Sequence, residues 1–376
     1  AVELKGLYIK VGQFISTRAD IAPEPYVRIL SQLQDRVPPR PADMVETVMR
    51  EDLGTTTGEA FAEFEQEPIA AASLAQVHRA RMHDGRTVAV KVLYPEVAGL
   101  VRLDLRNLRT LARLVAWREP SFDYRTIVEE LARQFPLEVD FEREARMTEM
   151  VAANLRGYPR IVVPDVVREL SGPRIVVTEY LEGQRVIGAH IDALPQEERE
   201  RLAAEISGAF GHQVLVDGLF QADPHPGNLL LLNDGRVGLL DFGLTKELPE
   251  AMRVGFARLV VAAASRDPVR IVKAFQDLGV RVRNDRPEDL LMLSSLFFDA
   301  RPIGEERGHA ARERSQALAR NPVEAIPGDL VLLGRVVGLL RGVCASMGVS
   351  LSPMEMLRPY AEQVLEEEKG AAPDGP

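Results

Sequence analysis

The chain has 376 residues, of which 46% are hydrophobic and 27% are charged. This composition is typical of a folded protein and excludes a wholly disordered, collagen-like or porin-like chain. At about 150 residues per domain, the length predicts two or three lobes. The chain carries 46 basic and 56 acidic residues, a net charge of −10, and this excess of acid disfavours nucleic acid as a partner.

Cysteine content and hydropathy indicate in which cellular compartment we expect the protein. Cys344 is the single cysteine, so an internal disulfide and a cysteine-rich zinc site are excluded, and its apolar surroundings predict a place in the core. The first residues show no basic region followed by a long apolar run, so we expect no secretory signal. The apolar stretch 330–351 is interrupted by Arg335 and Arg341, so we expect no transmembrane helix. We expect a cytoplasmic protein.

The first half of the chain predicts a helical start followed by a sheet. Residues 4–35 have apolar positions at helical spacing, and residues 68–94 form short β-type runs with a hairpin turn at Asp84-Gly85. Helical periodicity then covers 96–118 and 124–155, and two further strands are predicted at 161–163 and 175–178. We therefore expect a five-stranded sheet with inserted helices.

From about residue 196 the pattern favours helices. A hairpin interrupts them, with its turn at residues 233–235 (Asn-Asp-Gly) between apolar runs at 229–232 and 237–240. The predicted fold class is α+β, with a small antiparallel sheet lobe followed by a helical lobe.

Three elements predict a site for phosphoryl transfer. Asp241-Phe242-Gly243 follows the second strand of the late hairpin, and upstream Asp223 and Asn228 have the D-x-x-x-x-N spacing of a kinase catalytic loop. Residues 88–91 (Val-Ala-Val-Lys) end a predicted strand as the kinase V-A-I-K motif does, and strand alternation places Ala89 and Lys91 on one face. Their order along the chain fits a single mechanism.

Other kinase elements are altered or absent. A glycine-rich loop is expected before the Lys91 strand, and alanine stands at each glycine position of the string that begins with Ala70, Ala71, Ala72 and Ser73. Each Cβ restricts positive φ, so nucleotide binding is expected with altered geometry. Residues 220–222 (Phe-Gln-Ala) replace the residues that carry His-Arg, and no Ala-Pro-Glu follows Asp241. A conventional serine/threonine kinase that docks peptides is therefore disfavoured.

Four ordered motifs together resemble the UbiB/AarF/ADCK family of atypical protein-kinase-like proteins. They are residues 10–13 (Lys-Val-Gly-Gln), the alanine-rich loop, residues 138–140 (Glu-Val-Asp) and residues 221–228 (Gln-Ala-Asp-Pro-His-Pro-Gly-Asn). The resemblance runs from about residue 4 to 245. It implies a protein-kinase-like two-lobed fold, with an N-terminal helical extension over the active site (1–52), an N-lobe (53–181) and a C-lobe (182–376).

The resemblance also implies an activity and its partners. We expect an atypical kinase or ATPase that uses ATP and Mg²⁺ and supports quinone biosynthesis, of ubiquinone type, or membrane-lipid homeostasis. Quinone precursors or other lipids are the expected partners, with peripheral contact at the inner face of a membrane. The alternative is a nucleotide-binding pseudokinase that scaffolds lipid-biosynthetic proteins, against which the complete set of kinase residues argues.

Roles follow from matching positions. Lys91 is expected to contact the α- and β-phosphates and to pair with Glu144, while Asn228 and Asp241 hold Mg²⁺ and Asp223 occupies the catalytic-base position. The remaining expected site residues are those of the nucleotide loop (Ala70, Ala71, Ala72, Ser73), the hinge (Thr178 as gatekeeper, Glu179, Leu181) and the polar network of the extension (Lys10, Gln13, Glu138, Asp140). His225 lacks a cluster of partners and is expected to cap or pack rather than bind metal.

Overall fold

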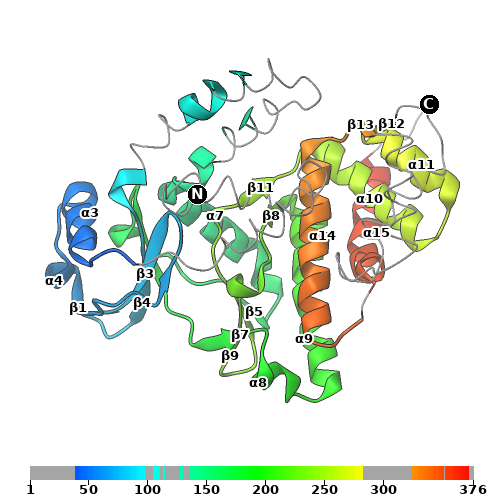
Figure 1. Ribbon diagram of the computed structural model, residues 1–376. Coiled ribbons are helices and arrows are strands. Elements are labelled where there is room, and N and C mark those ends of the chain that lie inside the picture. Colours follow the sequence, from blue (N-terminus) through cyan, green and yellow to red (C-terminus); the bar gives the residue numbers. More distant parts are fainter. Residues whose placement is uncertain are drawn as a thin grey trace. The chain divides into compact units, whose positions relative to one another are not determined.

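The computed structural model describes residues 39–97, 105–110, 113–114, 128–129, 132, 135–282, 323–350 and 352–371 (Figure 1). The predicted N-terminal helix, with Lys10 and Gln13, lies outside these ranges. Contacts divide the chain into unit 1, residues 1–149 with 164–180, and unit 2, residues 150–163 with 181–376. The lobe boundaries given above remain a prediction.

Unit 1 is built on a five-stranded antiparallel sheet. Strands β1, β3, β4 and β6 follow one another in that order, and β2 pairs with β3. The Asp84-Gly85 turn joins β3 to β4 as predicted, with Gly85 at φ 90° and its N–H donating to the carbonyl of Met82. The strand bounds are β1 Phe61–Phe64, β2 Ala70–Ala71, β3 Ala75–Met82, β4 Thr87–Leu93 and β6 Ile175–Glu179.

One face of this sheet is covered by α3 (Asp43–Leu53). The valines at 88, 90 and 92 on β4 are buried in one cluster with Val45 and Met49 of the helix. Strand side chains alternate between faces, so Ala89 and Lys91 lie on the opposite face. The register pairs Ala89 with Thr178, which places the predicted gatekeeper beside it on that face.

The sequence interpretation of the fifth strand was wrong. Residues 161–163 were expected in this sheet, but β5 (Ile161–Val162) runs parallel to a strand of unit 2. The fifth strand of unit 1 is β1 instead, which pairs with β3. A two-residue apolar strand has no periodicity that could specify its partner, so only the tertiary structure assigns it.

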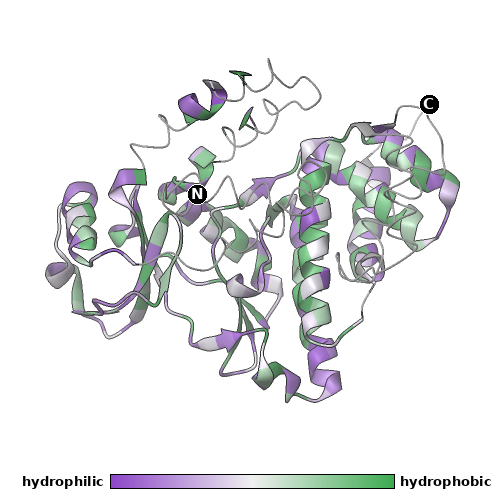
Figure 2. Cartoon of the chain, in the orientation of Figure 1, coloured by the Kyte–Doolittle hydropathy of each residue, from purple (hydrophilic) through white to green (hydrophobic). Residues whose placement is uncertain are grey.

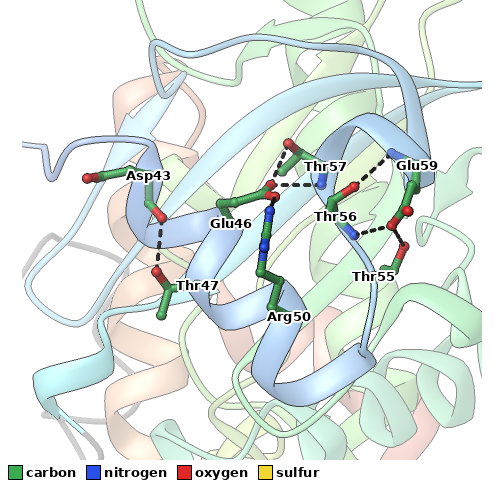
Figure 3. A network of polar contacts seen from close by, with 8 residues as sticks. All are labelled: Asp43, Glu46, Thr47, Arg50, Thr55, Thr56, Thr57 and Glu59. Atoms are coloured by element: carbon green, nitrogen blue, oxygen red, sulfur yellow. Dashed lines mark hydrogen bonds and ion pairs between the residues drawn. The ribbon is translucent and has the colours of Figure 1, made fainter.

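A polar network joins α3 to the short helix α4 (Thr57–Ala60) and so leads the chain into β1 (Figure 3). Glu46 accepts hydrogen bonds from the N–H of Thr57 at 2.9 Å and from its hydroxyl at 2.8 Å, and it also pairs with Arg50. These bonds, those of Thr57 first, hold the pKa of Glu46 below its ordinary value. Thr56 and Glu59 form a capping box at the start of α4.

His78 is buried within unit 1 in a network that assigns its protonation state. The N–H of Arg40 donates to Gln76 Oε1 at 2.8 Å, so the amide Nε2 of Gln76 faces His78 Nε2 at 2.8 Å. An amide nitrogen only donates, so His78 Nε2 accepts and Nδ1 carries the hydrogen, which it donates to the carbonyl of Glu65 at 2.8 Å. The imidazole is therefore neutral.

We expect acid to destabilise the fold through His78. Burial lowers the pKa of His78 from its ordinary value of 6.5, so the unfolded chain binds the proton more readily than the folded one. The stability this group contributes is complete above pH 6.5 and is lost as pH falls through the lowered pKa. Urea denaturation of His78→Met should show a weaker loss of stability than wild type between about pH 7 and pH 5.

The matched control for this prediction is His83→Asn. His83 is exposed beside the turn between β3 and β4. Its replacement should preserve the acid dependence of the wild type. Equal acid dependence in His78→Met and wild type would contradict the prediction.

Unit 2 contains a four-stranded sheet in the order β5, β10, β9, β7, and a separate antiparallel pair of β8 with β11. The predicted hairpin is present as β9 (Leu229–Leu232) and β10 (Val237–Leu239), with Gly235 at φ 81° in its turn. The other strands are too short to be seen as periodic patterns in the sequence. They are β7 Gly183–Arg185, β8 Leu219–Gln221, β11 Thr245–Glu247, β12 Arg281–Val282 and β13 Val323–Ala325.

Helices form the rest of the described part of unit 2. The π-helical segment η4 (His212–Asp217) continues α9 and leads into β8. The helices are α8 Ala189–Asp192, α9 Gln196–Gly211, α10 Glu250–Ala264, α11 Pro268–Asp277, α14 Gly328–Ser346 and α15 Pro353–Ala371. Helix α7 (Phe141–Asn154) begins in unit 1 and ends in unit 2.

Helix α14 carries polar residues within an apolar sequence. Figure 2 shows both hydrophilic and hydrophobic colours along it. Cys344 is buried in this helix, as the sequence predicts, and burial raises the pKa of its thiol. Within the described ranges, no helix combines the length and the hydropathy that crossing a membrane requires.

Candidate active site

In unit 1, Lys91 and Glu144 form an ion pair between β4 and α7. Lys91 Nζ lies 2.6 Å from Glu144 Oε1, and the side chain of Glu144 is only 6% exposed. Lys91 Nζ also lies 5.2 Å from the ring centroid of Phe141, within cation–π range. The two residues that kinases use as the phosphate-binding pair are therefore in contact here.

Asp140 caps the helix that supplies Glu144. Its Oδ1 accepts the N–H of Arg143 at 2.8 Å, and its carbonyl accepts the N–H of Glu144 at 3.0 Å. An aspartate at this position satisfies a donor of the first helical turn. Glu138 is half-buried two residues earlier, in the helical residues 135–138. Their predicted contact with Lys10 lies outside the described residues.

The alanine-rich loop is one arm of a tight hairpin. Ala70 pairs with Val77 and Ala71 with Gln76, and the N–H of Ala72 donates to the carbonyl of Ala75 at 2.8 Å. Among the described non-glycine residues, only Asp241 and Arg266 have positive φ, so this hairpin contains no backbone position that demands glycine. Ser73 is buried, whereas Ala70 and Ala72 are exposed.

The predicted hinge begins at the end of β6. The N–H of Glu179 donates to the carbonyl of Asp165 at 2.8 Å, and the N–H of Tyr180 donates to the carbonyl of Thr87 at 3.0 Å. Leu181, the first residue of this segment in unit 2, is buried. A Cβ at Gly238 on β10 would come within 2.9 Å of its side chain, so the glycine makes room for Leu181.

In unit 2, hydrogen bonds hold the predicted catalytic loop against the hairpin that precedes Asp241. Asn228 Nδ2 donates to the carbonyl of Asp223 at 3.1 Å, and the carbonyl of Asn228 accepts the N–H of Leu240 at 2.8 Å. His225 Nδ1 accepts the N–H of Gly227 at 3.1 Å and caps the turn η5 (Pro226–Asn228), as expected. Asp223 and Asn228 are thereby joined to Leu240, which lies between the end of β10 and Asp241.

Asp241 has a left-handed backbone conformation, with φ 59°. For a residue with a Cβ, this conformation costs on the order of 1–3 kcal/mol and is maintained only where surrounding bonds enforce it. Its carboxylate Oδ1 accepts the N–H of Gly243 at 3.2 Å, and the residue as a whole is exposed. The chain therefore presents a carboxylate at the surface of unit 2.

Sequence reasoning missed Gln221, which holds the peptide groups around Asp241. Its side chain is fully buried, and Nε2 donates to the carbonyls of Leu240 at 2.5 Å and of Asp241 at 2.6 Å. Gln221 stands two residues before Asp223, the position at which the kinase catalytic loop has histidine. That substitution was visible in the sequence, but its hydrogen bonds were not.

Sequence reasoning also missed the contact of Arg335 with Asp223. Arg335 on α14 donates from Nη2 to Asp223 Oδ1 at 2.9 Å, and both side chains are about one-third exposed, at 31% and 29%. The sequence signal for this contact was the charge of Arg335 within an otherwise apolar segment. That charge served only to exclude a transmembrane helix. Asp223 could not be identified as its partner, because the two residues are far apart in sequence.

The oxygen ligands present fit Mg²⁺ bound together with a nucleotide. Asp241 offers a carboxylate. Asn228 uses its amide nitrogen to bind the carbonyl of Asp223, so its amide oxygen points away from that carbonyl and is the atom that could coordinate a cation. Mg²⁺ is commonly held by one or two such oxygens, completed by phosphates and water. The described residues contain no cluster of three or more potential metal-binding side chains, and this two-ligand set requires none.

Each unit thus gathers its own predicted residues. Unit 1 joins Lys91 to Glu144 and aligns Ala89 with Thr178, while unit 2 joins Asp223, Asn228 and the turn at Asp241. The α+β fold, with its lysine–glutamate pair and its D-x-x-x-x-N and Asp-Phe-Gly segments, is that of a protein-kinase-like protein.

Comparison with known proteins agrees with this class. The family model described as the ABC1 atypical kinase-like domain matches residues 32–275. The chain is 33% identical over 368 residues to AarF domain-containing protein kinase 1 of Xenopus tropicalis, covering 94% of this chain and 70% of that protein. It is 34% identical over 293 residues to the uncharacterized protein slr0889 of Synechocystis, covering 75% and 72%.

The similarity extends to plant proteins and to a solved structure. ACTIVITY OF BC1 COMPLEX KINASE 8, a protein of Arabidopsis thaliana described as chloroplastic, is 30% identical, with 95% of this chain spanning 52% of that protein. The Mycobacterium tuberculosis structure titled as the complex of Rv3197 with erythromycin has a TM-score of 0.66 at 28% identity, covering 96% of this chain and 93% of that one. The chain belongs to the ABC1 atypical kinase-like family, also known as UbiB/AarF/ADCK.

Proposed function

We propose that the protein is an atypical kinase or ATPase that binds ATP with Mg²⁺ and transfers the terminal phosphoryl group to an acceptor other than a generic peptide. The contact between Lys91 and Glu144 at 2.6 Å carries this proposal. In protein kinases this pair must be formed for the lysine to hold the α- and β-phosphates.

The proposed roles divide between the two units. Lys91 holds the phosphates, and the alanine-rich loop (Ala70, Ala71, Ala72, Ser73) covers them. Thr178, Glu179 and Leu181 read the base. Asn228 and Asp241 bind Mg²⁺, and Asp223 orients or deprotonates the attacking group. Lys10, Gln13, Glu138 and Asp140 remain the predicted regulatory network of the N-terminal extension.

The wider role rests on the family resemblance. We propose support of quinone biosynthesis, of ubiquinone type, or of membrane-lipid homeostasis, with quinone precursors or other lipids as partners. The protein would then act in the cytoplasm with peripheral contact at the inner face of a membrane. The absence of Ala-Pro-Glu after Asp241 supports an acceptor smaller than a docked peptide.

One observation favours the alternative, a nucleotide-binding pseudokinase scaffold. Arg335 donates to Oδ1 of Asp223, and an occupied carboxylate oxygen is less accessible to an acceptor hydroxyl. The alternative predicts nucleotide binding without turnover. The proposed function predicts turnover that depends on Asp223.

The deciding experiment measures Mg²⁺-dependent ATP turnover in wild type and Asp223→Asn, with and without anionic liposomes and quinone-precursor mimics. We expect Asp223→Asn to lower kcat by about a hundredfold or more, since a general base contributes roughly 10²–10⁴. Its affinity for ATP should stay close to that of wild type. A generic protein substrate should not be phosphorylated.

The control is Asp277→Asn, which makes the same substitution at an exposed residue at the end of α11. It should turn over ATP at the wild-type rate. ATP binding without turnover under every condition would establish the scaffold instead.

A further inference from the structure

We infer that Gln221 is a positioning residue that sets the carboxylate of Asp241 for its cation. This inference rests on the proposed function, because it concerns the metal site of that function. It adds a residue outside the set with expected roles in phosphoryl transfer. Gln221 acts on the backbone around Asp241, not on the nucleotide.

The hydrogen-bond geometry carries the first step. The two bonds from Gln221 Nε2 turn the carbonyls of Leu240 and Asp241 toward a buried amide. Asp241 itself is exposed and has φ 59°. With both flanking carbonyls fixed inward, the left-handed backbone directs the carboxylate outward.

Gln221 is itself held in place by its main chain. Its N–H donates to Oε1 of Gln213, a fully buried residue of η4, at 3.1 Å. Gln221 also ends β8, where it pairs with Thr245 of β11 just beyond the Asp241 turn. The N–H of Ala222 donates to the carbonyl of Leu244 at 3.0 Å. The main chain of Gln221 is therefore fixed to η4 and to the residues that follow the Asp241 turn.

The chemistry of an amide suits two acceptors. A glutamine Nε2 carries two hydrogens and can serve two adjacent carbonyls, whereas a neutral histidine has one N–H. The amide also does not titrate, so its hold on the turn is independent of pH. Glutamine can therefore donate to both carbonyls, those of Leu240 and Asp241, whereas a neutral histidine at this position could donate to only one of them.

The test uses the full chain and two probes, Mn²⁺ with ADP, and a fluorescent ADP analogue in EDTA. Electron paramagnetic resonance titration should show Mn²⁺ bound at least tenfold more weakly in Gln221→Met and Gln221→Glu than in wild type. Both replacements approximate the side-chain length and remove the donors. Gln221→His should recover most of the affinity, and metal-free binding of the analogue should change less than threefold in all three variants.

Loss of stability alone is controlled by Leu259→Ala. Leu259 is buried in α10 of the same unit and has no proposed role in the site. This variant should unfold more easily and still bind Mn²⁺ as wild type does. Unchanged Mn²⁺ affinity in Gln221→Met, or equal weakening in Leu259→Ala, would overturn the inference.

Hydrogen exchange of residues 239–247 separates this inference from the proposed function. The N–H groups of Gly243 and Thr245 are bonded within this segment, to Asp241 Oδ1 and to the carbonyl of Phe242. Faster exchange there in Gln221→Met supports the positioning of the turn, and unchanged exchange overturns it. Wild type that binds no Mn²⁺ with ADP would overturn the proposed metal site, and the role of Gln221 toward a cation with it.

Discussion

Replacing Asp241 by asparagine is expected to remove most of the metal-dependent part of ATP binding. The substitution removes the negative charge that would hold Mg²⁺ against the phosphates. Thermal or urea denaturation with and without Mg-ATP measures the effect. At about a hundred times its dissociation constant, the ligand should stabilise wild type by roughly 2.7 kcal/mol. The variant should show little of this gain.

The substitution Asp241→Asn should remove the charge of this side chain without changing the conformation of the turn. Asparagine is as tolerant of the left-handed backbone as aspartate, and its Oδ1 can still accept the N–H of Gly243. The fold without nucleotide should therefore be close to wild type in stability. Loss of metal-dependent binding would then report the charge and not the conformation.

Asp234→Asn is the matched control for this prediction. Asp234 is exposed in the turn between β9 and β10, where its carboxylate accepts the N–H of Arg236 at 3.0 Å. This variant should retain the full stabilisation by Mg-ATP. If Mg-ATP stabilised wild type and Asp241→Asn equally, the assignment of Asp241 as a metal ligand would be wrong.

Local patterns predicted the parts of the fold that depend on neighbours in sequence. Both Asp-Gly turns join the strands that flank them, because a glycine at positive φ in the third position closes a three-residue hairpin loop. The alternation along β4 correctly placed Ala89 and Lys91 on one face. Asp223 and Asn228 of the catalytic loop lie together because they are close neighbours in the sequence.

Long-range pairing was beyond the sequence. The strand at 161–163 was assigned to the wrong sheet, since its partner Val237 is distant in sequence and either sheet could bury its apolar side chains. The contact of Arg335 with Asp223 was missed for the same reason. Gln221 was noticed as a substitution, but a polar residue in a motif does not reveal which carbonyls it binds.

Asp140 shows how one residue can serve a local and a proposed distant role. Its carboxylate caps α7, and Glu144 lies one turn farther along that helix. The cap therefore fixes the start of the helix from which Glu144 reaches Lys91. This contact accounts for an acidic residue at position 140 without the predicted link to Lys10, and the two roles are compatible because a carboxylate has two oxygens.

The pair formed by Lys91 and Glu144 should prove more costly to break than to replace. Lys91→Met alone leaves a carboxylate that is 6% exposed without the ammonium group 2.6 Å away. Removing one partner of a buried ion pair costs about 3–5 kcal/mol, and we expect the lower end because Lys91 is one-fifth exposed. Urea denaturation at neutral pH should show this loss of unfolding free energy.

The double variant Lys91→Met with Glu144→Gln separates folding from function. It replaces both charges by neutral side chains of similar size, so most of the lost stability should return. Affinity for Mg-ATP should not return, because no cation remains on β4 to meet the α- and β-phosphates. The control replaces a surface pair on α15, Arg358 and Glu362, by Met and Gln in the same way. This control should change neither the free energy of unfolding nor the free energy of Mg-ATP binding by more than about 0.5 kcal/mol.

Two results would contradict this account of the pair. If Lys91→Met and the double variant were equally unstable, the buried charge of Glu144 would not be the source of the loss. If the double variant bound Mg-ATP as wild type does, Lys91 would be a structural residue and the proposed phosphate contact would fall. Stability restored without affinity is the expected outcome, since a neutral pair can fill the space between β4 and α7 but cannot balance the charge of a triphosphate.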